Sequence, residues 1–453
     1  MSSVLLQPKE KKRQSMIWGG QIAFLAAVCF GTFFIAEHDI KMSEVQNFVQ
    51  DIEQQESWGE GGNSARRIAF LGCAFIGLFG IAKGELHRFR WNLPMALLVL
   101  YLAWTAGSMT WSIDPGATAR RYILMLCCVI GCFGITRFLT MEQVLLATVI
   151  TLSGLLSVGV LAEIALGNFK PHQGDYRFAG TLHPNSQAAN LAMLSISSFT
   201  MARLRPKFKW VFYGVMGVAV FFLVITKCRT VTAVLPVSLM VIWLVTQPLK
   251  QITIGGLIVV WVFSISVLGF LVAGFDPISE YSEVLLLGRG EETGTSLTGR
   301  LPLWTELSSY IKNRPLQGYG FGAFWTPGHI NDIFIGQGWV ISEAHSSYVD
   351  TSLQTGLIGA LLMVSIAFST FFYAVIVYRR TKKTEYVFII GGVVFCLIRG
   401  FTESGLNGPS GFSSSLFLAM AAHSWNASNQ ESESDCPEQL SERYSVSRGI
   451  IYE

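Results

Sequence analysis

The chain has 453 residues, of which 51% are hydrophobic and only 14% are charged. A soluble protein carries about 25% charged residues, so this chain lacks the polar surface that three soluble domains of about 150 residues would need. Its 33 Lys and Arg side chains nearly balance 30 Asp and Glu side chains, for a net charge of +3, which leaves no basic domain for nucleic acid. The composition predicts an all-α polytopic membrane protein and excludes soluble, disordered and collagen-like chains.

The eight cysteines do not form a recognisable metal or disulfide framework. Most of them lie inside apolar runs, and neither a CxxC pair nor a Cys/His cluster has the spacing of a zinc site. We interpret them as small buried hydrophobic residues. The sequence therefore predicts no metal site and no cofactor.

Apolar runs long enough to cross a bilayer core of about 30 Å predict about eleven or twelve membrane helices. This divides the chain into N-terminal membrane helices (1–274, about nine spans), a large loop (275–355), C-terminal membrane helices (356–424) and a Ser/Glu-rich disordered tail (425–453). The candidate spans lie near residues 16–36, 67–82, 92–109, 122–138, 143–165, 187–203, 210–226, 231–247, 252–274, 356–378, 386–399 and 410–424.

Lys and Arg residues predict the orientation of these spans. They gather near the N-terminus and in the loops at 83–90, 203–209 and 379–383, which fall on one side of the membrane. Positive loops face the cytoplasm, so both termini are predicted to be cytoplasmic. Two long loops then lie outside: residues 37–66, where we expect a short amphipathic helix at the interface, and the loop at 275–355.

The large loop contains most of the chemical information. A helix opening at Thr298 or Gly299 would place Trp304, Leu307 and Ile311 on one face. The glycine-rich stretch at 318–322 fits either a tight turn or a phosphate-binding backbone.

Charged residues gather on the predicted outer face. A lone membrane-proximal arginine often snorkels or pairs with a carboxylate, and a lone histidine is often structural. Convergence of several such residues instead favours a site for an anionic lipid headgroup. The residues that the topology brings together are Arg177, Arg229, Arg300, His345, Arg399 and Glu403.

Several motifs share the spacing of a known family of membrane glycan enzymes. They are Arg300-(x3)-Trp304, Arg314-Pro315-Leu316-Gln317-Gly318-Tyr319-Gly320, His345-Ser346-(x9)-Gly356-(x2)-Gly359, Trp111-Ser112-Ile113-Asp114-Pro115 and Phe178 to Pro184-Asn185. With them, residues 90–410 resemble the O-antigen ligase/polymerase (Wzy_C, WaaL-like) superfamily, and its exopolysaccharide-production (ExoQ-type) branch most. Lys227-Cys228-Arg229-Thr230 departs from the family's usual Ser-Arg-Ser/Thr-like turn.

The resemblance implies a GT-C-like glycosyltransferase of the bacterial inner membrane that acts at its outer face. Its donor would be a glycan on undecaprenyl pyrophosphate, with membrane lipid, a flippase and chain-length regulator proteins as further partners and no nucleic acid. An arginine fork suits the pyrophosphate leaving group, and a neutral histidine with a pKa near 6.5 suits the acceptor proton.

The same resemblance implies roles for individual residues. His345 and Arg300 are the expected catalytic residues, and the expected substrate-binding residues are Arg229, Arg177, Trp304, Tyr319 and Glu403. His183, in its Pro-Asn setting, is interpreted as a structural turn.

Three functions stay open from the sequence: a polymerase of lipid-linked repeats, a ligase that moves a glycan onto lipid A-core or another acceptor, and a transporter without chemistry. An outer loop of about 80 residues and the lack of a clear internal repeat argue against a transporter. Polymerase and ligase share the donor and differ in the acceptor, which the loop residues do not reveal.

Overall fold

The computed structural model describes residues 19–29, 31–32, 64–83, 92–174, 176–248, 296–337, 341, 343–404 and 416–423. The predicted span near 252–274, nearly all of the predicted interfacial helix in 37–66 and the predicted disordered tail lie outside these residues. Within the described part the secondary structure is helical and contains no strand. The prediction of an all-α polytopic membrane protein is confirmed.

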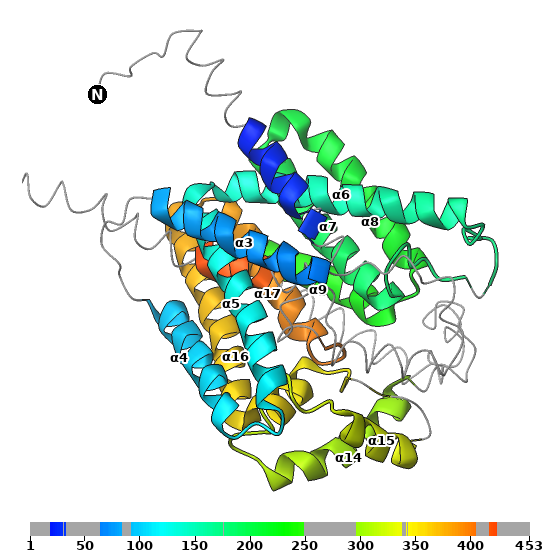
Figure 1. Cartoon of the computed structure of the whole chain (residues 1–453). Helices are drawn as coiled ribbons and strands as arrows, with labels where there is room; N and C mark the ends of the chain where they lie inside the picture. Colours follow the sequence, from blue (N-terminus) through cyan, green and yellow to red (C-terminus); the bar gives the residue numbers. More distant parts are fainter. Residues whose placement is uncertain are drawn as a thin grey trace, which may run out of the picture.

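Helices follow one another along the described chain, joined by connections of different lengths (Figure 1). Residues 19–29 and 416–423 are also helical, and two short 3-10 turns are η1 (Ser108–Thr110) and η2 (Pro206–Phe208). The longer helices are α3 (Ser64–Lys83), α4 (Leu93–Gly107), α5 (Pro115–Phe138), α6 (Met141–Ala165), α7 (Pro184–Leu204), α8 (Lys209–Ile225), α9 (Arg229–Thr246), α14 (Ser296–Asn313), α15 (Pro327–Gln337), α16 (Ser347–Thr381) and α17 (Glu385–Arg399).

Capping residues decide where several helices begin. The Asp114 side chain accepts a hydrogen bond from Ala117 N, and Pro115 occupies the first turn, where its missing N–H is harmless. Helix α5 therefore begins at Pro115, before the apolar run near 122 on which the prediction relied. Thr140 and Gln143 form a reciprocal capping box that starts α6.

Among the residues that the structure describes, six helical segments are long and apolar enough to cross a membrane. They are residues 93–110, 115–138, 141–165, 206–225, 229–246 and 347–381. Helices α7 and α17, which the sequence predicted as spans near 187–203 and 386–399, are not among them. At about 1.5 Å per residue, the 15 residues of α17 reach about 22 Å, less than the hydrocarbon core.

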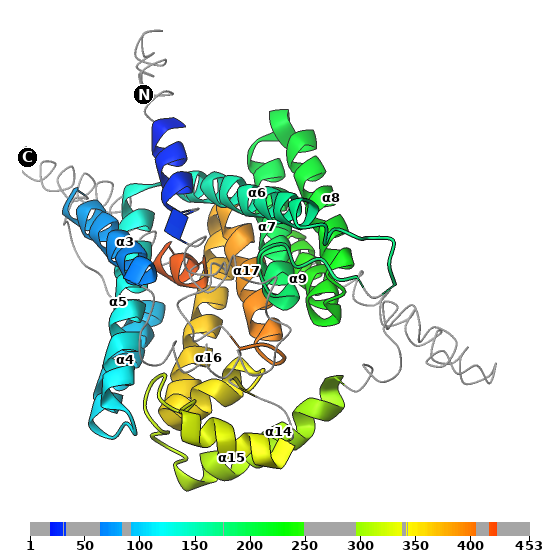
Figure 2. The same ribbon diagram turned by 45° about the vertical axis from the view of Figure 1, so that its right-hand side comes forward.

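Helices α7 and α17 instead form the centre of the bundle. Every residue of α17 from Tyr386 to Cys396 is buried, and α7 buries polar side chains such as Ser195 and Thr200 along with its apolar ones. Helix α17 packs against α7, α9 and α16, and α7 packs against α6 and α8. Figures 1 and 2 show α17 enclosed by these longer helices.

Helix α16 consists of two helical pieces that meet at Gly356, so the start that the sequence predicted for the membrane helix coincides with this kink and a shorter helical piece from Ser347 precedes it. Gly356 interrupts the helix with φ 68° and ψ −176°, and a Cβ there would overlap the Leu316 carbonyl. The glycine-rich stretch docks on this interruption, because Tyr319 N and Gly320 N donate hydrogen bonds to carbonyls of α16 over 2.8 Å. Its N–H groups are thus engaged by protein, which supports the turn over the phosphate cradle.

Helices α14 and α15 form a small lobe at one end of α16 (Figure 1). The lobe has its own core, separate from the main one, which comprises Leu303, Leu307, Tyr319, Phe324, Ile333, Ile341, Ala344 and Leu353. Leu353 belongs to α16, so this core fixes the lobe against the first turns of that helix. The segment that carries His345 runs between the lobe and α16.

Candidate functional site

The His345 segment is held on both sides of the histidine. Trp304 Nε1 donates a hydrogen bond to Ala344 O over 2.9 Å. On the other side, Ser347 N donates to Gly400 O over 2.8 Å, and Ser347 Oγ donates to Glu403 O over 2.8 Å. Between these anchors His345 has φ 49°, a left-handed conformation that a side chain with a Cβ rarely adopts. Tertiary contacts therefore impose the backbone that sets the direction of the ring.

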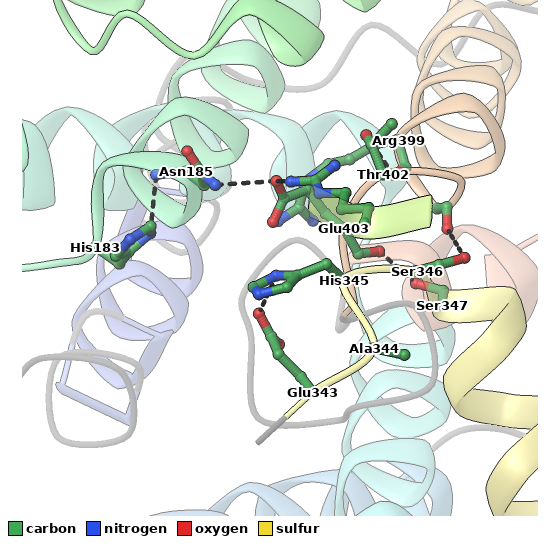
Figure 3. Close-up of polar contacts among 12 residues, drawn as sticks. His183, Asn185, Glu343, Ala344, His345, Ser346, Ser347, Arg399, Thr402 and Glu403 are labelled. Carbon is green, nitrogen blue, oxygen red and sulfur yellow. Dashed lines mark hydrogen bonds and ion pairs between the residues drawn. The ribbon is translucent and has the colours of Figure 1, made fainter. Parts of the chain in front are cut away.

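The His345 ring faces a carboxylate from its own segment. Its Nδ1 lies 3.0 Å from Glu343 Oε1 (Figure 3). Burial lowers the pKa of His345, and the positive charge of Arg300 lowers it further. The hydrogen bond and charge of Glu343 and the charge of Glu403 raise this pKa by more, so it lies above its usual value. Burial raises the pKa of Glu343, but the hydrogen bond and charge of His345 lower it by more, so the pKa of Glu343 lies below its usual range.

This pair changes the expected state of the histidine. The sequence analysis assumed a neutral imidazole with a pKa near 6.5. Beside Glu343 the ring is a stronger base, and protonation extends to higher pH than for an isolated histidine. A carboxylate that orients one ring nitrogen while the other serves a reacting hydroxyl is a familiar arrangement for a general base.

Glu403 lies at the meeting point of three chain segments. Arg300 Nη2 is 3.2 Å from Glu403 Oε1, with the two side chains 17% and 7% exposed. Asn185 Nδ2 donates a hydrogen bond to the same oxygen over 2.9 Å (Figure 3). Burial raises the pKa of Glu403, and the positive charges of Arg399 and Arg300 oppose that rise. The carboxylate thus aligns Arg300 and Asn185 and holds them beside His345.

Two further predicted arginines reach this region in different ways. Arg177 donates from Nε to Thr226 O over 3.0 Å and from Nη2 to Asn185 Oδ1 over 3.2 Å. Asn185 thereby links Arg177 to Glu403. Arg229 is the first residue of α9 and follows Cys228, which lies close enough to Arg177, Arg399 and Glu403 to interact with their charges.

Arg399 ends α17 and, with Arg300, adds positive charge beside Glu403. It interacts electrostatically with both Glu403 and Glu343. Its Nε is buried and makes no hydrogen bond to any residue that the structure describes. Of the six residues expected to converge, the structure brings Arg300, His345, Arg399 and Glu403 together. It links Arg177 to Glu403 through Asn185, and it places Arg229 directly after Cys228 at the start of α9.

Trp304 and Tyr319 do not join this cluster. Trp304 supports the His345 segment through Ala344 O. Tyr319 is buried in the lobe, where its hydroxyl donates to Tyr310 O over 3.1 Å and its ring packs against Phe324. Both aromatic side chains therefore pack in the lobe or against its core, and their role in binding substrate stays a prediction.

His183 has the structural role that its Pro-Asn setting predicted. It is the N-cap of α7, and its Nδ1 accepts a hydrogen bond from Asn185 N over 3.3 Å. The cap fixes Asn185 at the first turn of α7, where its side chain reaches Glu403 (Figure 3).

The sequence analysis assigned no role to Glu343 or Asn185. A signal was present for each residue: Asn185 closes the Pro-Asn motif, and Glu343 stands two residues before the histidine. Neither spacing shows which way the side chain points, so only the folded backbone reveals the contacts.

Three side chains of the cluster have the spacing of metal ligands. One ligand atom each from Glu343, His345 and Glu403 lies within 4.8 Å of the others. However, the Arg300 guanidinium already contacts Glu403 Oε1 over 3.2 Å, and a positive charge beside this carboxylate repels a second cation. We therefore interpret the cluster as an ion-pair network.

Comparison with known proteins now identifies the segment that holds most of this cluster. Residues 176–364 match the family model described as O-antigen ligase. This segment is similar to the O-antigen ligase family. The resemblance predicted from the sequence motifs is confirmed, although the match is shorter than the 90–410 range proposed for it. The matched segment contains Arg177, Arg229, Arg300 and His345 and ends before Arg399 and Glu403.

A curated relative is similar to part of the chain. It is the exopolysaccharide production protein ExoQ of Rhizobium meliloti (strain 1021), 27% identical over 133 residues. The aligned region spans 28% of this chain and 30% of the relative. The comparisons support an O-antigen ligase or polymerase type of role for a multi-pass membrane protein.

Proposed function

We propose that the protein polymerises undecaprenyl-pyrophosphate-linked oligosaccharide repeats in exopolysaccharide or O-antigen biosynthesis. The observation that carries this proposal is the juxtaposition of a carboxylate-paired histidine with a partly buried guanidinium. His345 Nδ1 lies 3.0 Å from Glu343 Oε1, and Arg300, which comes from α14, pairs with Glu403 beside the histidine. Base and cation stand together, as glycosyl transfer from a lipid pyrophosphate requires.

The reaction is a displacement at the anomeric carbon of the donor sugar. The acceptor hydroxyl oxygen forms a bond to that carbon, and the bond from the carbon to the pyrophosphate oxygen breaks. The pyrophosphate departs with the bonding electron pair, and the acceptor proton passes to His345 Nε2, on the side of the ring away from Glu343. No metal or redox cofactor enters this balance.

Each charged residue then has a distinct task. The pyrophosphate gains negative charge as the bond breaks, and Arg300 offers a planar, permanently charged fork to it. Arg399, Arg177 and Arg229 supply further positive charge at the same end of the bundle. Glu343 stabilises the imidazolium that forms when His345 accepts the proton.

The proposal includes a place and an orientation. The site would lie at the outer face of the bacterial inner membrane, with both termini in the cytoplasm. The bundle end that holds the site carries His183 and His345, and the opposite end carries the basic loops at 203–209 and 379–383, which fits positive loops inside.

A ligase is the second candidate, because the matching family is described as O-antigen ligase. The two reactions share the donor and the base and differ only in which hydroxyl attacks. In a polymerase the acceptor is itself a lipid-linked glycan, whereas in a ligase it is lipid A-core or another molecule.

The test is reconstitution with defined acceptors. Purified protein in bilayers receives lipid-linked repeats alone, or lipid-linked repeats with lipid A-core, and mass spectrometry follows the products. A ladder of lipid-linked oligomers without lipid A-core supports the polymerase. Transfer only to lipid A-core makes the protein a ligase, and movement of intact donor across the bilayer without a new glycosidic bond makes it a transporter.

A further inference from the structure

Asp350 is a buried carboxylate that connects three segments around the proposed site. It lies in the first turns of α16 and is 3% exposed. Its Oδ1 accepts hydrogen bonds from Trp325 Nε1 over 2.9 Å and from Ala344 N over 3.2 Å. Its Oδ2 accepts a hydrogen bond from Ser404 Oγ. All three donors come from outside α16.

The two ends of this connection adjoin the reacting groups. Ala344 immediately precedes His345, and Ser404 immediately follows Glu403. Ala344 is held at both of its backbone polar atoms, since Asp350 accepts from its N–H and Trp304 donates to its carbonyl. The peptide that leads into the left-handed His345 residue is therefore fixed in space.

A capping role does not explain these contacts. Ser346 is the N-cap of α16, and Asp350 lies inside the helix. A residue that only stabilised the helix start would bond to N–H groups of that same helix. A carboxylate is instead an acceptor with two oxygens, which suits a position that accepts hydrogen bonds from the lobe, from the His345 segment and from the segment that follows α17.

We propose that Asp350 is a positioning residue that holds the His345 segment so that the imidazole faces Glu343. Its effect on turnover rests on the proposed glycosyl transfer, but its effect on the geometry of the Glu343–His345 pair does not. Replacing Asp350 removes the acceptor for Ala344 N, and the side of the segment that precedes His345 then keeps only the Trp304 bond to Ala344 O. The ring loses its fixed direction towards Glu343.

Variants at Asp350 separate hydrogen bonding from packing. Asp350→Asn keeps an oxygen that accepts from Trp325 and Ala344, and its amide can donate to the Ser404 hydroxyl. This variant should therefore keep the geometry of the Glu343–His345 pair. Asp350→Ala removes all three bonds, and Asp350→Leu removes them while filling the space. Thr351→Ala is the matched control, because Thr351 is buried in the same turn but bonds to Ser347 O within α16.

The readout is the reactivity of His345 itself, measured without substrate. Diethyl pyrocarbonate modifies neutral imidazole, so the pH midpoint of modification at the His345 peptide reports the basicity of the ring in full-length protein in bilayers. The charged groups around this ring are Glu343, Glu403 and Arg300, with His183 and Arg399 acting on Glu343. Glu343→Gln calibrates the loss of the partner.

Wild type, Asp350→Asn and Thr351→Ala should share a midpoint above that of an ordinary histidine. Asp350→Ala and Asp350→Leu should move it down, towards the Glu343→Gln value, and lower turnover at least about tenfold with donor affinity kept. If Asp350→Ala or Asp350→Leu accumulates as intact protein and its pH midpoint for His345 modification equals that of wild type, the proposal is overturned. If wild-type protein transfers no glycan at all, the proposed function fails while the midpoint comparison still decides the role of Asp350.

Discussion

The substitution Arg300→Lys tests whether the pyrophosphate is bound by a guanidinium fork. Arg300 pairs with Glu403 over 3.2 Å, and both side chains are largely buried. Removing one partner of a buried pair costs about 3–5 kcal/mol of stability, so Arg300→Ala would confuse folding with binding. Lysine keeps the positive charge opposite Glu403 and leaves the Asn185 hydrogen bond in place. It loses the planar pair of donors.

The size of the effect follows from the lost contact. A hydrogen bond to a charged group contributes about 1.5–3 kcal/mol. At about 1.4 kcal/mol for each factor of ten, loss of one such bond weakens donor binding about 10- to 150-fold. The loss should appear in turnover as well, because the pyrophosphate carries more charge in the transition state.

The assay measures donor affinity and initial rate on purified protein at matched amounts. The control is Arg205→Lys, the same change in an arginine that pairs with Glu142. Arg205 follows the last residue of α7, and the length of this helix, about 30 Å at about 1.5 Å per residue, separates it from Asn185 and the site. Arg205→Lys should behave as wild type. Wild-type affinity and rate in Arg300→Lys would refute a bidentate role for Arg300.

Three other predictions concern the base, the orientation and the metal. His345 must be neutral to accept a proton, and Glu343 raises its pKa, so wild-type activity should fall as pH drops through that raised pKa. Glu343→Gln should shift this fall in activity to lower pH and reduce the maximal activity at higher pH. A fall in activity at the same pH in Glu343→Gln and wild type would contradict the pairing. In a cysteine-free background, Asn331→Cys should react with an impermeant reagent outside intact cells and Lys382→Cys should not, whereas the reverse pattern overturns the orientation. Chelators should leave glycosyl transfer unchanged, and loss restored by a divalent ion would instead assign metal binding to the carboxylates beside His345.

Helix ends were predictable wherever a local signal exists. Asp114 with Pro115, and Thr140 with Gln143, cap helices through contacts between residues near in sequence. Hydropathy likewise identified the apolar helices but did not separate lipid-facing from central ones. It measures how apolar a segment is, and α17 is enclosed by protein because of long-range packing.

The candidate site was predictable as a location and less so as a set of contacts. Topology alone brought Arg300, His345 and Glu403 to one end of the bundle, because alternate loops share a side of the membrane. The partner of His345 was not predictable, since the φ of 49° at that residue decides where the ring points. The contacts of Tyr319 were not predictable either, because the folded backbone places its ring in the core of the lobe.

The substitution His345→Ala tests the central claim most directly, with donor affinity and turnover measured on one preparation of the variant. The arginines and Glu403 remain, so affinity for the lipid-linked donor should stay close to that of wild type. Turnover should fall about 10²- to 10⁴-fold, the usual cost of losing a general base. Near-normal turnover, or lost affinity with residual turnover, would contradict the assignment of His345 as the base.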